Sequence, residues 1–350
     1  MSDPRVPERP MLTSRDVARL AGVSQATVSR VIHGSTAVSE PTRERVERVL
    51  DRTGYKPNLM ARAMRTRRTG TVGVVVTRLT NPFYPHLLEA LNRTLEQAGY
   101  RMILWEASGD GERAAEDAIR QGLVDGAICT TITARSTLLR LAVEEQAPIV
   151  LVNRGVPDAP VDQVTSDNRQ AARTIARYLV DGGHRRIGMI CGPPEASTST
   201  ERERGFCSGL EELGLTVDPK LVYRGDFSHR DGHRGMGELL ASSEPPTAVF
   251  CVNDLLALGA LDRARSAGVA VPRDVWVVGY DDIEMAAWEA FDLTTIKQPL
   301  AEMALAAVEL LNARLQNPGA PRQSMRFPGE LIIRGSTAHA PERLHGGDDT

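Results

Sequence analysis

The chain has 350 residues, of which 41% are hydrophobic, so it is long enough for two or three domains with substantial cores. Its net charge of −3 conceals an asymmetry, because residues 1–70 carry 14 Lys and Arg against 7 Asp and Glu, whereas the remainder carries 28 against 38. A basic segment at one end of an acidic body indicates that this end binds nucleic acid, and a merely solvated basic surface does not explain such confinement.

Residues 1–10 are polar and rich in proline, and we expect them to be disordered. They lack the apolar stretch of a signal peptide, and no apolar run in the chain approaches membrane-spanning length. The four cysteines stand apart without a CxxC pair, as reduced core residues do. We therefore predict a cytoplasmic protein with no membrane partner.

Residues 13–33 predict two short helices joined by a tight turn. Thr13 and Asp16 form the capping-box pattern of a helix start, and Gly22 suits the left-handed backbone of a helix end. Ser24 is expected to cap the second helix. The predicted inward stripes are Val17, Leu20 and Ala21 in the first helix and Val28, Val31 and Ile32 in the second. This arrangement is typical of a DNA-binding helix-turn-helix.

The outward face of the second helix carries side chains suited to reading DNA bases. Arg30 can donate to guanine O6 and N7 together, Gln25 can pair with adenine, and Ala26 can touch a thymine methyl group. Hydroxyl side chains nearby can bind phosphates. The alternative is an ordinary helical hairpin with a polar outer face. That alternative does not explain why caps, turn and base-reading residues all occur together.

The run DVARLAGVSQATVSRVIHGSTAVSEPTRERVERVLDRTGYKPN resembles the headpiece of the LacI/GalR family of bacterial transcriptional regulators, and the resemblance continues through nearly the whole chain. Gln25, Ala26 and Arg30 match the family's base-reading positions. His33 stands where the family usually has Asn, which makes its backbone contact less certain. The phosphate-binding positions that the resemblance implies are Thr13, Ser24, Thr27, Ser29 and His33.

A third helix, capped by Ser39 and ended by Gly54, completes a headpiece predicted over residues 11–57. Residues 58–70 form a basic hinge helix and linker, too short to be stable alone in water. The resemblance implies that this helix forms on operator DNA and pairs with its dimer mate in the minor groove. The minor-groove positions are Asn58, Ala61 and Met64, with Met64 replacing the family's Leu wedge. A basic flexible linker is the alternative.

From residue 71 short apolar runs alternate with helical segments, and two such series predict two doubly wound parallel-sheet lobes. The resemblance implies a core over residues 71–340 that is like a periplasmic sugar-binding protein. We expect the chain to cross between the lobes near Gly182, Gln298 and Met325. The lobe boundaries that follow are 71–181 with 299–324 for the first lobe and 183–297 with 326–338 for the second, before a disordered tail at 341–350.

Polar and aromatic residues follow the predicted strands, where ligands bind in parallel sheets. Arg, Asn, Asp and an aromatic ring together suit a polyhydroxylated ligand. We expect Asp254, next to Asn253, to cap a helix and Asp282, next to Asp281, to be a solvated carboxylate. The resemblance adds Asp167 and Gln298 near the pocket. The full predicted effector set is Phe83, Tyr84, Thr130, Asp167, Arg202, Phe227, Asn253, Asp281 and Gln298.

Competing chemistry has weaker support. Residues 109–114 fit GxGxxA, but the acidic residue expected about twenty positions on is missing. His229 and His233 have the spacing of a metal pair, but Gly232 weakens a helix there and a solvated surface is the simpler interpretation. No nucleophile motif or phosphate loop is recognisable, so we predict neither an enzyme nor a cofactor.

The sequence thus predicts a homodimeric transcriptional regulator, most simply a repressor, that binds a palindromic operator and responds to a small effector, a sugar or sugar derivative. The C-terminal segment has no leucine heptads, which favours a dimer over a tetramer. The alternative is a sugar-binding protein of the periplasmic type without DNA-regulatory activity.

Overall fold

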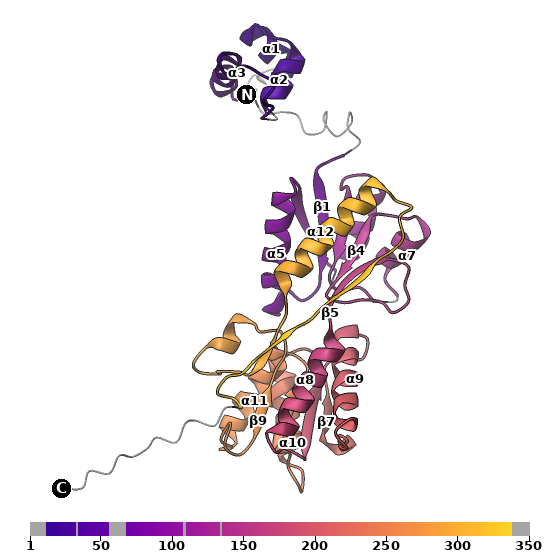
Figure 1. Ribbon diagram of the computed structural model, residues 1–350, viewed down its shortest axis with the longest axis vertical. Helices are drawn as coiled ribbons and strands as arrows, with labels where there is room; N and C mark the ends of the chain where they lie inside the picture. Colours follow the sequence, from indigo (N-terminus) through magenta and orange to yellow (C-terminus); the bar gives the residue numbers. More distant parts are fainter. Residues whose placement is uncertain (1–11, 33, 56–67, 108–109, 134, 338–350) are drawn as a thin grey trace, which may run out of the picture. The chain divides into compact units, whose positions relative to one another are not determined.

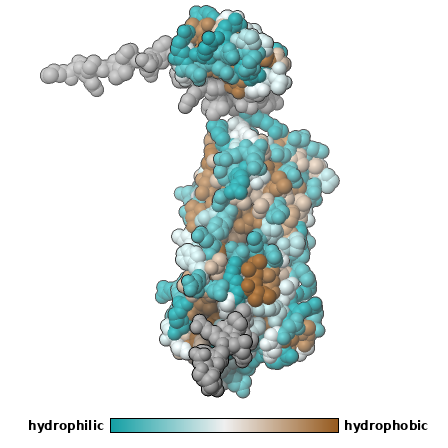
Figure 2. All heavy atoms as spheres, turned by 60° about the vertical axis from the view of Figure 1, so that its left-hand side comes forward, coloured by the Kyte–Doolittle hydropathy of each residue, from teal (hydrophilic) through white to brown (hydrophobic). Residues whose placement is uncertain are grey.

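The computed structural model describes residues 12–32, 34–55, 68–107, 110–133 and 135–337. The chain divides into two compact units, Met1–Thr69 and Gly70–Thr350, which we call the headpiece and the core and describe separately (Figure 1). The predicted termini at 1–10 and 341–350 lie outside the described residues, as do the hinge positions Asn58, Ala61 and Met64. The visible surface is mostly polar, with separate apolar patches (Figure 2).

The headpiece contains α1 (Ser14–Ala21), α2 (Gln25–Ile32) and α3 (Glu40–Thr53). The predicted capping box begins α1, with the Asp16 amide donating to the Thr13 hydroxyl at 3.3 Å and the Thr13 amide donating to the Asp16 carboxylate at 3.0 Å. Gly22 ends α1 with φ 64°, a left-handed conformation that favours glycine. The predicted helix-turn-helix is therefore confirmed.

The headpiece core corrects one predicted contact. Leu20 is 48% exposed, and Ala18 is buried instead. Successive residues of a helix are turned by about 100°, so Val17, Ala21 and Ala18 share one face of α1 and Leu20 lies to the side of that face. The buried core of the headpiece consists of Val17, Ala18, Ala21, Val28, Val31, Val46 and Val49.

The first lobe of the core is built on six parallel strands in the order β11-β5-β4-β3-β1-β2. These strands are β1 (Thr71–Val76), β2 (Arg101–Glu106), β3 (Gly126–Cys129), β4 (Ile149–Val152), β5 (Asp162–Ser166) and β11 (Ser324–Phe327). Helices α5 and α12 lie side by side over one face (Figure 1). Helices α6 and α7 pack together against the other face. The helices are α5 (Phe83–Gln97), α6 (Gly111–Arg120), α7 (Thr137–Glu144) and α12 (Leu300–Gln316).

The second lobe has four parallel strands in the order β7-β6-β8-β9. They are β6 (Ile187–Cys191), β7 (Val222–Arg224), β8 (Ala248–Cys251) and β9 (Trp276–Val278). Helix α8 packs on α9, and α10 packs on α11. The helices are α8 (Asn168–Asp181), α9 (Ser197–Glu211), α10 (His229–Leu240) and α11 (Asp254–Ser266), with short 3-10 helices at Pro219–Leu221 and Glu284–Ala287. The predicted class of two doubly wound lobes is confirmed.

The crossings between the lobes differ from the prediction at two of three places. The first lies near Asp167, between β5 and α8, and not near Gly182, because α8 packs on α9 of the second lobe. The second lies near Gln298, as predicted, between β10 (Thr295–Lys297) and α12. The third follows Phe327, because β11 continues past Met325 before the chain enters β12 (Glu330–Ile332), the antiparallel partner of β10.

A buried ion pair ties the end of α12 to the sheet of the first lobe. Arg314 donates through Nε to Asp162 at 2.9 Å, and both side chains are 2% exposed. Arg314 also donates to the carbonyl oxygens of Pro318, Ala320 and Pro321. Two buried charges are tolerated here because each satisfies the other and the remaining donors have acceptors.

Replacing Arg314 by Met should destabilise the core strongly, because Asp162 would keep a buried charge without its main partner. The expected loss in the free energy of unfolding is about 3–5 kcal/mol, measured by urea denaturation. The matched control is Arg93→Met, since Arg93 pairs with Glu89 at the surface with both side chains more than two-thirds exposed. That change should cost under about 1 kcal/mol; equal losses for the two variants would contradict the argument.

Candidate functional site

The headpiece presents the predicted base-reading side chains on α2. Gln25, Ala26 and Arg30 are all exposed, while Val28 and Val31 of the same helix are buried. The Gln25 amide donates to the hydroxyl of Ser14 at 2.6 Å, which links the starts of α1 and α2. An exposed helix face with Gln and Arg side chains fits the major groove.

The predicted phosphate-binding hydroxyls lie at the helix starts. Thr13 caps α1, and the Ser24 hydroxyl accepts from the Thr27 amide at 3.1 Å at the start of α2. Ser29 is half-buried further along α2, and His33 lies outside the described residues. Helix starts concentrate backbone donors and positive potential, both of which favour a phosphate.

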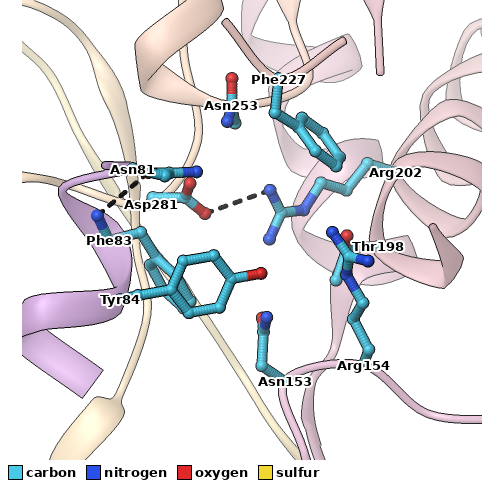
Figure 3. A pocket seen from close by; sticks show the side chains of 10 residues that line it. All are labelled: Asn81, Phe83, Tyr84, Asn153, Arg154, Thr198, Arg202, Phe227, Asn253 and Asp281. Carbon is cyan, nitrogen blue, oxygen red and sulfur yellow. Dashed lines mark hydrogen bonds and ion pairs between the residues drawn. The ribbon is translucent and has the colours of Figure 1, made fainter. Parts of the chain in front are cut away.

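The core contains a pocket between its two lobes (Figure 3). Nearly every lining residue lies just after the carboxyl end of a strand, where doubly wound sheets bind ligands. The first lobe contributes the segments after β1 and β4, and the second contributes those after β6, β7, β8 and β9. The lining residues are Asn81, Phe83, Tyr84, Asn153, Arg154, Thr198, Arg202, Phe227, Asn253 and Asp281.

An ion pair between Arg202 and Asp281 lies at the floor of the pocket. Nη1 of Arg202 lies 3.1 Å from Oδ1 of Asp281, and the two side chains are 3% and 6% exposed. Arg202 also donates to the Asn168 side chain at 2.8 Å and to the Val252 carbonyl at 2.7 Å. Its guanidinium carbon stacks 3.6 Å from the centre of the Tyr280 ring. Arg202 is therefore held rigidly by groups from several elements.

Gln298 supports the floor from the second crossing. Its amide donates to Asp281 at 2.7 Å, but Gln298 is not among the residues that line the pocket. It therefore orients Asp281, whose φ of 125° is rare for a residue with a side chain. Asn253 also has a double role, because it lines the pocket and its side chain caps α11 by accepting from the Leu256 amide at 3.0 Å.

Two carboxylates differ from their predicted roles. Asp254 follows the true cap, Asn253, and is fully buried, accepting from the Thr295 hydroxyl at 2.5 Å and the Ile283 amide at 2.9 Å. Asp282 is not solvated, because it accepts from Arg334 at 2.7 Å with its side chain 15% exposed. The prediction failed because burial at these turns depends on β10 and the C-terminal segment, which are distant in sequence.

The predicted pocket aromatics are in place. Phe83 and Tyr84 meet edge to face, with ring centres 5.4 Å apart, and Phe227 lines the wall of the second lobe. The Phe227 ring lies so close to the backbone at Gly192 that a Cβ there would be 2.3 Å from it. Glycine at 192 is thus required for the ring to reach the pocket.

Two predicted pocket residues lie elsewhere. Thr130 is buried and donates to the Val75 carbonyl at 3.1 Å, so it closes the sheet after β3. Asp167 caps α8 by accepting from the Gln170 amide at 3.1 Å. Neither is among the lining residues, because Thr130 is bonded to the backbone of the neighbouring strand β1 and Asp167 to that of its own helix.

Four lining residues were not predicted: Asn81, Asn153, Arg154 and Thr198. Asn153 and Arg154 directly follow the apolar run of β4, so the strand-end rule that found the other residues could have found them. Asn81 follows β1 in the same way, and its side chain accepts from the Phe83 amide at 3.1 Å. Thr198 had no such signal, because it lies in the first turn of α9.

Burial perturbs the acids around the floor. Desolvation raises the pKa of Asp281 to about 6 against the opposing effect of Arg202, so this carboxyl is mainly ionised at neutral pH. The pKa of Asp254 is raised to about 7, mainly by desolvation and to a smaller extent by the negative charge of Asp281. Burial also raises the pKa of Tyr84, which keeps its hydroxyl protonated as a donor.

The competing sites acquire ordinary partners. His229 bonds with Asp262 at 2.8 Å, while Asp231 accepts from Ser228 and Tyr223. Across the described ranges no cluster of three His, Cys, Asp or Glu side chains could hold a metal ion. Gly111 of the GxGxxA match begins α6, and Gly109 lies outside the described residues. In the same described ranges, no helix is both long and apolar enough to span a bilayer.

Comparison with family models matches both units. Residues 13–58 match the bacterial regulatory proteins of the lacI family, and residues 176–337 match a periplasmic binding protein-like domain. The HTH-type transcriptional repressor CytR of Escherichia coli is 35% identical over 94% of this chain and 97% of its own length. The HTH-type transcriptional repressor PurR of Photobacterium profundum is 34% identical over 93% of this chain and 98% of its own.

Solved structures agree with these relatives. A complex of the transcriptional regulator CelR with cellobiose has a TM-score of 0.72 at 34% identity, covering 93% of this chain and 99% of its own. The Lac repressor dimer bound to operator and the anti-inducer ONPF has a TM-score of 0.80 at 26% identity, with the same coverage. Both units of the chain therefore have counterparts in single known proteins.

The raised pKa of Asp254 predicts a pH dependence of stability. A carboxyl whose pKa rises on folding stabilises the native state fully below its unfolded value of 3.8, and this contribution is lost as pH rises through about 7. Asp254→Asn should flatten the fall in the free energy of unfolding between about pH 4 and pH 7. The residual slope is expected from Asp281, whose pKa is also raised.

The measurement is urea denaturation at a series of pH values, with the slope as readout. Asn places an amide group against the Ile283 amide, so the variant is expected to be less stable throughout, but this does not affect the slope. The control is Asp274→Asn, because the Arg273 side chain lowers the pKa of Asp274 and its titration lies below this window. An unchanged slope in Asp254→Asn would show that Asp254 is ionised across the range.

Proposed function

Since the chain belongs to the lacI family of bacterial regulatory proteins, we propose that it is a cytoplasmic repressor that binds a palindromic operator as a homodimer and is controlled by a small effector. The observation that carries this proposal is the presence in one chain of an exposed base-reading row on α2 and a polar inter-lobe pocket. A sugar-binding protein without regulatory activity has no use for the first of these features.

The headpiece chemistry supports sequence-specific reading. Arg30 offers two parallel donors for guanine, and the exposed Gln25 amide both donates and accepts, as adenine requires. A single headpiece core is small, so one copy presents few contacts. Two copies on half-sites about one helical turn apart double the contacts and select a palindrome.

The edge of the first lobe supports dimer formation. Strand β2 is the last strand of its sheet, and its Ile103 and Leu104 are 43% and 39% exposed. Apolar side chains on an open strand edge favour association with another chain. The operator-bound Lac repressor, which is structurally similar to this chain, is a dimer.

The pocket supports effector control because it joins the two lobes. Asp281 and Asn253 can bind hydroxyl pairs, while Phe227 and Phe83 can cover the C–H face of a ring. Arg78 of the first lobe and Asp226 of the second form an ion pair 3.2 Å long, so the lobes also touch directly. A ligand that binds one lobe arrangement better shifts operator affinity, and operator DNA shifts ligand affinity by the same factor.

Selection from a randomised DNA pool, at a stated salt concentration, tests the proposal directly. We expect an enriched palindrome for the natural chain. Arg30→Ala should lose discrimination at one position of each half-site, at a cost of about 1–3 kcal/mol. The control is Arg19→Ala, an exposed arginine of α1 paired with Asp16, which should retain the palindrome. Failure to enrich any sequence, with or without a panel of sugars, would leave the sugar-binding alternative.

Asp281→Asn should abolish the response to the effector while operator binding persists. Asn keeps the shape and tolerates the φ of 125°, but it loses the charge that pairs with Arg202 and binds ligand hydroxyls. The measurement is operator affinity with and without effector. Asp282→Asn is the control, because Asp282 is the next residue in the chain but its carboxylate pairs with Arg334 outside the pocket. A normal response in Asp281→Asn would remove this residue from the binding site.

A further inference from the structure

The charges that line the pocket do not balance. The lining contains two cations, Arg154 and Arg202, and one anion, Asp281. Arg202 and Asp281 neutralise each other across 3.1 Å. Arg78, in the same segment after β1 as the lining residue Asn81, is neutralised by Asp226. Arg154 therefore leaves the pocket with one excess positive charge.

Arg154 is placed to use that charge on a ligand. It directly follows β4, and within the described ranges it forms no ion pair. Its Nε atom is buried without a hydrogen-bond partner, which is costly unless a ligand supplies an acceptor. Its guanidinium carbon lies 5.7 Å from the centre of the Phe227 ring. Stacking on a ring uses the face of the guanidinium and leaves the N–H groups along its edge free to donate.

The surroundings of Arg154 add neutral donors to the same place. The Arg154 side chain extends beside Thr198 toward the space bounded by Arg202 and the Tyr84 hydroxyl (Figure 3). Burial raises the pKa of Tyr84, so its hydroxyl remains a donor, and the charge of Arg154 is the largest opposing influence on it. Among these groups only Asp281 is an anion, and it is already bonded to Arg202 and Gln298.

We propose that the effector is an acidic sugar derivative, with a carboxylate or phosphate monoester bound by Arg154 and hydroxyl groups bound around Asp281 and Asn253. A guanidinium fork binds both kinds of oxyanion through paired, charge-assisted hydrogen bonds. A neutral sugar would leave the Arg154 charge partly desolvated without a counterion. The proposal rests on the proposed function only in taking this pocket as the effector site.

The test measures binding to the purified full-length protein by calorimetry, using matched acidic and neutral sugars. One arm pairs glucuronate with glucose and galacturonate with galactose; the other pairs glucose 6-phosphate with glucose and ribose 5-phosphate with ribose. We expect at least one acid to bind about 10- to 100-fold more tightly than its neutral partner. The arm in which the preference appears identifies the anion as carboxylate or phosphate.

Arg154→Gln should remove the preference while the affinity for the neutral partner changes little, because Gln keeps a donor but no charge. Arg93→Gln is the matched control, since it removes the same charge from an arginine that pairs with Glu89 at the surface of α5, and it should keep the preference. A cooperative urea denaturation curve with the natural midpoint shows that Arg154→Gln folds.

Three results would overturn the proposal: equal or tighter binding of the neutral sugars, an acid preference that survives in Arg154→Gln, or no binding by any acid of the panel. The selection of operator DNA is independent of these measurements. A chain that prefers acids through Arg154 but enriches no DNA sequence would refute the proposed repressor and leave the ligand class standing.

Discussion

The buried ion pair between Arg202 and Asp281 holds together the strand ends that form the pocket. Arg202 reaches the first turn of α8 through Asn168 and the end of β8 through Val252, while Asp281 is bound by Gln298 at the second crossing. One charge pair thus joins the first two of the three crossings between the lobes. Such a pair is tolerated in the interior when hydrogen bonds support both charges, as those of Asn168, Val252 and Gln298 do here.

The same constraint explains the chemistry available to a ligand. Because Arg202 and Asp281 neutralise each other, they provide shape and polarity without net charge, and the charge that a ligand meets is that of Arg154. Asp254, buried behind the floor with a pKa raised to about 7, is only partly ionised at neutral pH, and it does not line the pocket. The pocket therefore combines a rigid, neutral floor with one uncompensated cation on its wall, which is an arrangement that selects by charge as well as by shape.

The headpiece and the core use burial in different ways. Among the described residues of the headpiece, the buried ones are small or β-branched, such as Val17, Val28 and Val46, and the polar row on α2 is exposed. The core buries whole strands on both faces and places its polar residues at their ends. Recognition of DNA thus depends on the surface of one helix, whereas recognition of a ligand depends on segments from two lobes, which is why a ligand can influence how the lobes are arranged.

The sequence by itself determined the features that are local or periodic. Caps and the turn glycine at Gly22 defined the helix-turn-helix, and apolar strands alternating with helices defined the lobes and most of the pocket. Only the tertiary structure decided the rest. Strand β5, with the polar sequence DQVTS, is buried because β4 and β11 pair on either side of it, and this moves the first crossing to Asp167. Likewise, Thr130, Asp254 and Asp282 are bonded to residues far away in the sequence. No local sequence pattern encodes these partners, because buried polar groups bond to whatever folding brings near them.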